Sequence, residues 1–481
     1  MDSIQQDMFS CLPDVILIVI ISFLPFKDCV RTSLLSRRWR YLCHETKNLS
    51  FKESDYVSSS ITDDEFARYD ARVSFFRFID TWISRIHDQV VESFEICFSN
   101  PVGFAASIEA LIEFAVSKGV KKLVIDLSNP AWRRYNDVSY HHFVVTLPES
   151  VYSLTTLETL KIYGCNFDPS KFTNKGSLRR LFFGWMRLEQ LDSLLSKYPS
   201  LHSLSIKQCW GLDIRSIAGQ LREIDVENSD FSYMQCAFDL PNIYSLRYAG
   251  QLFDLHFDMK TIIEYVYLDF EVEAVHEEPS ESTRIDGEVI SGYLNGLRAA
   301  RTITVCPYLL QVYLNVYIFR LDFDKCDSPD CLLYPMETQH LVLRTKMHTK
   351  EFNGIRILLE NCPKLESLTF DILPPHPLPR TLSYRGIDPR TYWMVNRTYT
   401  CLMKTLKVVV VRNFGGSFNE LNILRYLIRC GSEYRPVLER VELYVPNGMD
   451  KSQAMAVHAK AEMLQKISKH VQILCAQCLT S

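Results

Sequence analysis

The chain has 481 residues, 47% of them hydrophobic and 12% aromatic, which is long and apolar enough for roughly two to four folded units and excludes a disordered protein. Its 53 basic and 57 acidic side chains give a formal net charge of −4, so neither nucleic acid nor an anionic membrane is expected as the main partner. The 15 cysteines are scattered and odd in number. Buried free thiols in a reducing compartment are the expected interpretation, with disulfides as the alternative.

Residues 1–10 form a short polar leader, and the first expected helix follows it. Pro13 and Asp14 suit a helix N-terminus, a mostly apolar run comes next, and Pro25 ends it. A run of about ten residues is too short to cross a bilayer, which takes about 20. The leader contains no Lys or Arg, so a secretory signal peptide is not expected either.

Two more short helices are expected over residues 27–35 and 36–43, the second with Ser36 as its N-cap. Three such helices enclose too little core to be stable alone, so their aliphatic surface should pack on a partner or on the rest of the chain. The segment resembles the F-box of plant proteins. The residues that carry the resemblance, in order and without a gap, are Leu12-Pro13-Asp14, Ser22-Phe23-Leu24-Pro25, Lys27-Asp28 and the run from Val30 to Leu42. Val15 departs from the family, which usually has an acidic residue there.

The resemblance implies that residues 11–50 bind a Skp-type adaptor, which bridges to a cullin-RING ubiquitin ligase. The residues expected to face the adaptor are Leu12, Pro13, Leu24, Pro25, Val30, Leu34, Leu35, Ser36 and Trp39. Two roles stay open for Trp39, as an anchor of that interface or as a residue of the F-box core.

Residues 51–89 are expected to hold a polar linker and then a connecting helix. Apolar residues recur at helical spacing from Val73 to Ile86, which predicts a helix over residues 71–87 with one packing face. We interpret this helix as a joint between the F-box and the rest of the chain.

A short unit with three apolar residues, spaced by two and then by one variable residue, recurs from residue 90 onward. It starts at Leu157, Leu178, Leu201, Leu221, Ile243 and Tyr265. These intervals fall within the 20–29 residue period of leucine-rich repeats. Each unit predicts a short strand with one buried face, and stacking the units would make one continuous core. An unrelated α/β domain is the alternative.

The expected fold class is therefore α+β, with a three-helix F-box followed by a leucine-rich-repeat solenoid over residues 90–395. The solenoid should be a curved parallel sheet with helices or loops outside. Two insertions should interrupt it, near residues 271–290 and 373–390. The first is acidic and is expected to be a solvated loop, with binding of basic cargo as the alternative. The second is rich in proline and is expected to be extended.

Residues 396–450 resemble the FBD region that follows the repeats in many plant F-box proteins. The matching residues are Cys401 to Lys407, Asn413-Phe414-Gly415-Gly416, Asn419-Glu420-Leu421, Tyr426-Leu427-Ile428 and Leu438-Glu439-Arg440-Val441. The pattern predicts a strand, a glycine turn that permits positive φ, a helix and a strand, which together cap the solenoid. Residues 451–481 are expected to form one amphipathic helix on the last repeat.

The variable strand positions of the repeats should line a concave surface that holds the target. The candidates are Lys161, Tyr163, Ser205, Lys207, Asp225, Glu227 and Arg247. This mixed set points to no particular class of target.

The sequence contains no phosphate-binding GxxxxGK loop, no GxSxG elbow and no HExxH helix. The doublet His141-His142 would point opposite ways on a strand, and the pair Cys475 and Cys478 has no second pair, so no metal or cofactor is expected. Cys165 and Cys209 are expected to be scaffold residues of the repeat turns. The chain should therefore be non-catalytic, with a site hidden between repeats as the alternative.

The resemblance implies a substrate-recognition subunit of an SCF-type (Skp-cullin-F-box) ubiquitin ligase, which acts by holding its target near the ubiquitin-loaded enzyme. A leucine-rich-repeat scaffold that serves no ligase is the alternative. The expected partners are the Skp-type adaptor, the cullin-RING ligase behind it and a target protein, with no nucleic acid and no membrane. The expected location is intracellular, in cytoplasm, nucleus or both, and not secreted.

Overall fold

The computed structural model describes residues 9, 11–57, 65–86, 89–129, 131–132, 143–172, 177–233, 235–257, 263–270, 281–312, 335–374, 387–394, 398–432, 437–448 and 450–477. Several predicted features lie outside these residues, namely most of the leader, His141-His142, the acidic residues 271–280, most of the proline-rich insertion and Cys478. Two compact units are distinguished, and each is described by itself. The first is Met1–Ile214 with Asn228–Tyr233, and the second is Arg215–Glu227 with Met234–Ser481.

The first unit begins with the three predicted helices. They are α1 (Asp14–Ser22), α2 (Phe26–Thr32) and α3 (Arg37–Leu42). Pro13 and Pro25 stand immediately before α1 and α2, where a missing backbone N–H costs nothing. Ser36 caps α3, because its Oγ accepts a hydrogen bond from the backbone N–H of Trp39 (3.4 Å). The three helices thus lie where they were predicted, although α2 begins one residue earlier and ends three residues earlier than the predicted range of 27–35.

Within the described residues, six parallel strands follow in sequence order, each hydrogen-bonded to the next. They are β1 (Asn48–Lys52), β2 (Ser93–Cys97), β3 (Lys122–Asp126), β4 (Thr159–Tyr163), β5 (Arg180–Gly184) and β6 (Ser203–Lys207). The second residues of β3 to β6 are leucines in register, each at most 1% exposed, so the repeated apolar position forms one continuous core.

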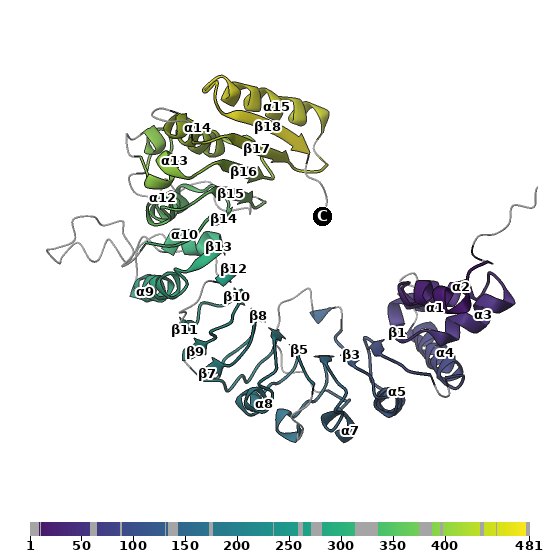
Figure 1. Ribbon diagram of the computed structural model, residues 1–481. Coiled ribbons are helices and arrows are strands. Elements are labelled where there is room, and N and C mark those ends of the chain that lie inside the picture. Colours follow the sequence, from purple (N-terminus) through teal and green to yellow (C-terminus); the bar gives the residue numbers. More distant parts are fainter. Residues whose placement is uncertain are drawn as a thin grey trace, which may run out of the picture. The chain divides into compact units, whose positions relative to one another are not determined.

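The chain returns from strand to strand on one side of this sheet, as Figure 1 shows for α5, α7 and α8. The helices of the first unit after the F-box are α4 (Glu65–Ile83), α5 (Ala105–Ser117), α7 (Glu149–Tyr152) and α8 (Leu191–Lys197). Short 3-10 turns are η1 (Cys43–Glu45), η2 (Glu53–Asp55) and η3 (Pro169–Lys171).

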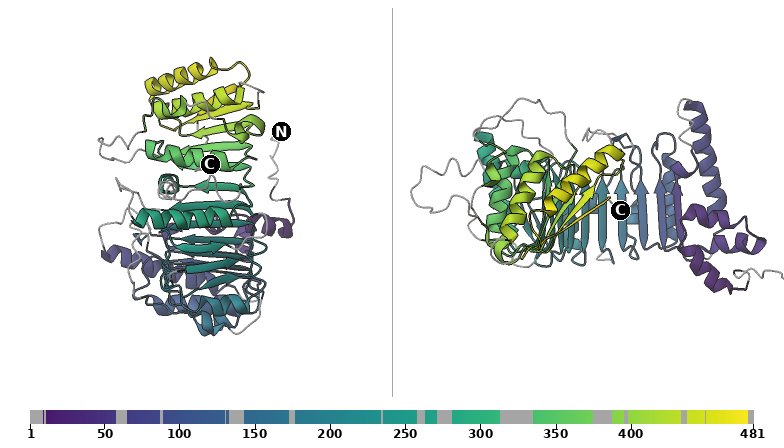
Figure 2. Two further views of the ribbon diagram at one scale, coloured as in Figure 1. Left: turned by 90° about the vertical axis from the view of Figure 1, so that its left-hand side faces the viewer. Right: turned by 90° about the horizontal axis from the view of Figure 1, so that it is seen from above.

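The second unit repeats the same arrangement, and the part of it that the structure describes has nine parallel strands in sequence order. They are β8 (Glu223–Glu227), β10 (Ser245–Gly250), β12 (Ile263–Phe270), β13 (Ala300–Val305), β14 (His340–Thr345), β15 (Ser367–Ile372), β16 (Val408–Arg412), β17 (Arg440–Val445) and β18 (Gln472–Gln477). Its helices, stacked along one side of the strands (Figure 2), are α9 (Glu281–Gly296), α10 (Pro307–Val312), α12 (Phe352–Asn361), α13 (Thr400–Lys404), α14 (Phe418–Ser432) and α15 (Lys451–Gln465). The turns η4 (Thr349–Glu351) and η5 (Tyr392–Met394) complete it.

A small second sheet replaces the helices in the shortest repeats of this unit. Its strands are β7 (Ser216–Ala218), β9 (Gln235–Asp239) and β11 (Asp254–Phe257), paired in the order β11-β9-β7. With about 20 residues per repeat, too few remain between successive core strands for a helix and its two loops. A strand, which rises about 3.3 Å per residue against 1.5 Å for a helix, spans the return path with fewer residues.

Two predictions about the second unit are wrong. Residues 281–290 are not a solvated loop but the start of α9, because Ile290, Tyr293 and Leu294 fall at helical spacing and are buried. The C-terminal helix does not continue past Gln465, since residues 472–477 form β18 and pair with β17. Leu474 fits the predicted helical stripe but lies on this strand.

Residues 408–445 form the predicted strand, turn, helix and strand, β16, α14 and β17. Gly416 has a φ of +65°, as the glycine turn requires. Ser417 and Glu420 cap α14 reciprocally: the Glu420 carboxylate accepts from the Ser417 N–H (3.2 Å), and Ser417 Oγ accepts from the Glu420 N–H (3.4 Å).

Glu351, at the end of η4, is a fully buried carboxyl group that makes stability depend on pH. It accepts hydrogen bonds from Thr345 Oγ1, the Lys346 N–H (3.2 Å) and Gln311 Nε2 (3.4 Å). Burial nevertheless raises its pKa from 4.5 to about 7. Between these two pH values the folded chain keeps a proton that the unfolded chain releases. The contribution of protonated Glu351 to the free energy of unfolding is therefore complete below pH 4.5 and is lost as the pH rises to about 7.

We expect Glu351→Gln to remove this dependence, because glutamine stays neutral at every pH. Relative to wild type, the variant should gain on the order of 3 kcal/mol in the free energy of unfolding between pH 4.5 and pH 7. Urea unfolding of both proteins across this range measures the difference. A constant difference would show that the pKa of Glu351 is the same in the folded and the unfolded chain.

Candidate functional site

The F-box helices expose large apolar side chains at two places. The first, here called the α1 stripe, is Val15 and Val19 on α1 and Phe23 directly after it, spaced four residues apart, while Leu17 and Ile21 on the same helix are buried. The second, here called the α2–α3 turn, is Leu34 and Leu35. Phe23 and Leu34 are each 82% exposed. Apolar side chains this exposed on a small helical unit mark an interaction surface.

Most of the predicted adaptor-facing residues lie at or beside these two places. Pro13, Leu24, Pro25, Leu34, Leu35 and Ser36 are exposed, and Leu12 and Val30 are half-buried. Trp39 is only 9% exposed and packs edge-on against Phe9, with ring centroids 6.3 Å apart. Of its two open roles, this burial favours the core of the F-box.

Sequence reasoning did not single out Val15 and Val19 as surface residues. The available signal was that the first helix has almost no polar face, so that three short helices could not bury all of it. The pattern did not predict which side of this helix is exposed to solvent. Val15, at the position usually acidic in this family, is 72% exposed.

Arg38 on α3 contacts the start of α1 and so stabilises the arrangement of the F-box helices. Its guanidinium pairs with the Asp14 carboxylate (2.6 Å) and donates to the carbonyl oxygen of Leu12. Inside, the Cys29 thiol on α2 contacts the carbonyl oxygen of Cys43 (3.5 Å). Both thiols are buried, and burial raises the pKa of Cys29 to about 12, so this thiol is protonated and structural.

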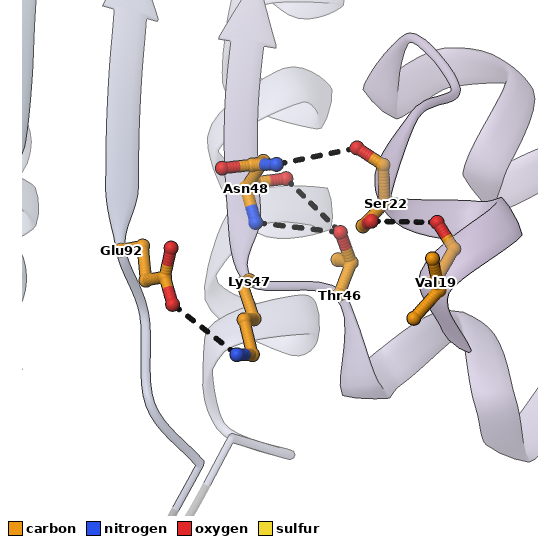
Figure 3. A network of polar contacts seen from close by, with 6 residues as sticks. All are labelled: Val19, Ser22, Thr46, Lys47, Asn48 and Glu92. Atoms are coloured by element: carbon orange, nitrogen blue, oxygen red, sulfur yellow. Dashed lines mark hydrogen bonds and ion pairs between the residues drawn. The ribbon is translucent and has the colours of Figure 1, made fainter. Parts of the chain in front are cut away.

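The F-box is joined to the repeats without a free linker, because the chain passes directly from η1 into β1, the first strand of the sheet. Residues 51 and 52, predicted as linker, belong to this strand. Figure 3 shows how Asn48 at its start donates to the carbonyl oxygen of Ser22 at the end of α1 (3.3 Å). Beside it, Lys47 pairs with Glu92 just before β2 (3.2 Å).

Aromatic side chains pack against one another at this junction between the F-box and the repeats. The ring of Phe26 on α2 lies 5.0 Å from Phe51 on β1 and 5.2 Å from Trp82 on α4, edge-on in both cases. Phe51 in turn contacts Phe94 on β2 (5.8 Å). Pairs of this geometry add about 0.5–1.5 kcal/mol each beyond the area they bury. The predicted connecting helix, α4, thus packs on both the F-box and the repeats.

Glu53 on η2 is a buried acceptor between these elements. Its carboxylate accepts from Arg72 Nε on α4 (2.6 Å) and from both the N–H and the Oγ of Ser99 after β2 (2.7 Å each). All three donors come from segments that are distant in sequence. The position of the F-box relative to the first repeats is therefore fixed by packing and by a charged hydrogen-bond network.

The predicted target-facing residues of the first unit differ in exposure. Lys161, Tyr163 and Lys207 are half-exposed on β4 and β6. Ser205 is only 5% exposed and so offers little surface for a contact. It aligns with Phe182 on β5, whose larger side chain leaves a short serine little surface.

In the second unit, Asp225 and Arg247 are in register on β8 and β10 and form an ion pair (3.4 Å). The Arg247 guanidinium also lies over the Tyr267 ring of β12, 4.1 Å from its centroid. Arg344 on β14 donates to Tyr267 Oη (2.7 Å). Glu227 is half-exposed. The charges of this region largely compensate one another.

The described part of the chain contains no cluster of three or more His, Cys, Asp or Glu side chains that could hold a metal ion. None of its helices is long and apolar enough to cross a membrane. The cysteines that the structure describes are free thiols. Burial raises the pKa values of Cys165 and Cys209, the latter to about 12, as suits scaffold residues.

These features define the class of protein: a small helical module with an exposed apolar surface, fixed to a solenoid of leucine-rich-repeat type. The F-box domain family matches residues 9–51. Two Arabidopsis thaliana proteins named as F-box/LRR-repeat proteins are 65% identical over 480 residues, covering 100% of both chains, and 51% identical over 483 residues, covering 98% of both. An F-box/FBD/LRR-repeat protein of the same plant is 22% identical over 489 residues, covering 98% of this chain and 96% of its own. The chain belongs to the F-box/LRR-repeat proteins, as its resemblance to plant F-box sequences predicted.

Proposed function

We propose that this chain is the substrate-recognition subunit of an SCF-type ubiquitin ligase. The F-box binds a Skp-type adaptor, and the adaptor connects the chain to a cullin-RING ligase. The observation that supports this most is the exposed apolar surface of the α1 stripe and the α2–α3 turn, on a module that membership of the family identifies as an F-box. Burial of these side chains against a partner is the driving force of binding.

The repeats hold the target in this proposal, and the chain supplies no catalytic group. The junction at Phe26, Phe51 and Glu53 sets the distance between target and adaptor, because it leaves no flexible linker between F-box and repeats. A fixed geometry raises the effective concentration of target lysines at the ubiquitin-loaded enzyme. The ligation chemistry comes from the partners.

Abundance of the target in cells tests this function. Proteins that co-purify with the chain should accumulate at least about twofold, and turn over more slowly after a block of translation, when Phe23 and Leu34 are replaced by aspartate. A matched Met455→Asp variant, with a similarly exposed apolar side chain on α15, should behave as wild type. If every co-purifying protein kept its wild-type lifetime, the chain would instead be a scaffold that serves no ligase.

A further inference from the structure

Among the described residues of the first unit, three cations on neighbouring strands form no ion pair with a carboxylate. They are Lys122 on β3, Lys161 on β4 and Arg180 on β5. Lys122, Thr159 and Arg180 are in register across the three strands, and Lys161 lies two residues along from Thr159, so all three side chains emerge on the same face of the sheet. No ion pair within the described residues includes any of them.

The acidic side chain on the neighbouring strand, Glu95, already has two partners. Glu95 on β2 accepts from Ser50 Oγ (2.6 Å) and pairs with Lys52 (3.4 Å), both on β1. Burial and the neighbouring charges of Lys122 and Arg180 lower the pKa of Lys161, while Glu95 only partly opposes this. The three cations therefore repel one another, and an anion placed among them would relieve that repulsion.

Lys161 is held in place by an aromatic ring. Its Nζ lies 4.0 Å from the centroid of Phe182, the residue in register with it on β5. A cation–π contact positions the ammonium group while leaving it without a carboxylate. Other charged side chains on the strands are paired, such as Arg247 with Asp225 and Arg301 with Glu264.

A groove of about 660 Å³ opens beside Lys122. It is bounded on one side by Ser93 and Glu95 on β2 and on the other by the F-box residues Pro25 and Arg31. Lys122 belongs both to the row of cations and to the lining of this groove, and the groove lies next to the F-box. A segment bound here would be held close to the module that contacts the adaptor.

We infer that Lys122, Lys161 and Arg180 form the docking site for an acidic, extended segment of a partner protein, rich in Asp or Glu. The inference rests on the proposed function, since it gives the chemistry of the target that the repeats hold. Charge complementarity selects this occupant: three uncompensated cations spaced over three strands match carboxylates spaced along an extended chain. Such a site contributes to selectivity and to the association rate, and it weakens as salt increases.

The test is a titration of the purified full-length chain with a fluorescently labelled poly-glutamate peptide, followed by fluorescence anisotropy at low salt. We expect binding to the wild type, and a Kd at least about tenfold higher for Lys122→Glu/Arg180→Glu. The milder Lys161→Gln should weaken binding less. Lys466→Glu/Lys469→Glu, which makes the same charge change at exposed positions after α15, should bind as wild type.

Equal weakening by the control pair would overturn the inference, because only net charge would then matter. Undiminished binding by Lys122→Glu/Arg180→Glu, with unchanged circular dichroism, would overturn it as well. Equal competition by single-stranded DNA would show a general polyanion site and not one for acidic protein segments. The titration contains no ligase component and therefore tests this inference alone. If the proposed function were wrong, a separate binding experiment would show no adaptor binding, while the peptide would still bind.

Discussion

Replacing Phe23 and Leu34 together with aspartate is expected to weaken binding of a purified Skp-type adaptor by at least about 100-fold. Both side chains are 82% exposed in the free chain, so a partner that covers them must desolvate whatever stands there. A carboxylate without a counterion in a covered interface costs several kcal/mol, and the apolar contact is lost in addition. Isothermal titration calorimetry with the purified proteins measures the change.

The same exposure implies that the fold survives the substitution, and thermal unfolding should shift by no more than a few degrees. The matched control is Met455→Asp on α15, where a side chain that is 74% exposed gains the same charge. Its affinity for the adaptor should equal that of wild type. Wild-type affinity in Phe23→Asp/Leu34→Asp would mean that the adaptor, if bound at all, uses another surface.

Glu53→Ala is expected to destabilise the first unit by about 3–5 kcal/mol, because it leaves the buried guanidinium of Arg72 without its partner. The substitution also removes the acceptor of both the N–H and the hydroxyl of Ser99. Urea unfolding, monitored by tryptophan fluorescence, measures the loss, since Trp82 belongs to the adjacent aromatic contact. In ligase assays, the freed F-box should still bind adaptor while target modification falls.

The control for this prediction is Asp28→Ala, which removes an ion pair between the same kinds of group at the surface. Asp28 and Arg31 are 2.9 Å apart and both substantially exposed, so their loss should cost less than about 1 kcal/mol. If the two variants were equally stable, the junction would be held by its aromatic contacts alone, and Glu53 would have no special role.

Local signals in the sequence were sufficient for the F-box helices and the repeat strands. Pro13, Pro25 and Ser36 stand where the three helices begin, because proline and serine act on the backbone within one turn. The apolar positions from Leu157 to Tyr265 recur at a nearly constant interval, so the strands followed from spacing.

Features that depend on distant partners were not predictable in this way. Strand β18 exists because β17 offers a free edge, which outweighs the helical spacing of Leu474. Strand β7 has only three residues and is stabilised by pairing with β9. Glu53 is an ordinary acidic residue in the sequence, and its importance comes from Arg72 and Ser99, which lie 19 and 46 positions away.

The candidate site was likewise predictable in part from local signals, and in part it depends on residues that are distant in the sequence. The resemblance located the F-box surface, yet only the fold separates the exposed Leu34 from the buried Trp39, because both lie in an unbroken stretch of family-like sequence. For the target surface, Lys161 was predicted from its strand position, whereas its neighbours Lys122 and Arg180 required the register of β3 to β5. Strand pairing, which joins residues tens of positions apart, is what a single sequence does not display.

Sedimentation of the purified wild-type chain mixed with a Skp-type adaptor tests the central claim most directly. The account predicts a stable complex with one adaptor per chain, formed by wild type and Met455→Asp and absent for Phe23→Asp/Leu34→Asp. Addition of a cullin should then give a larger complex with wild type. A wild-type chain that sediments alone, with its F-box helices intact by circular dichroism, would contradict the account and leave a repeat protein that binds its partners outside any ubiquitin ligase.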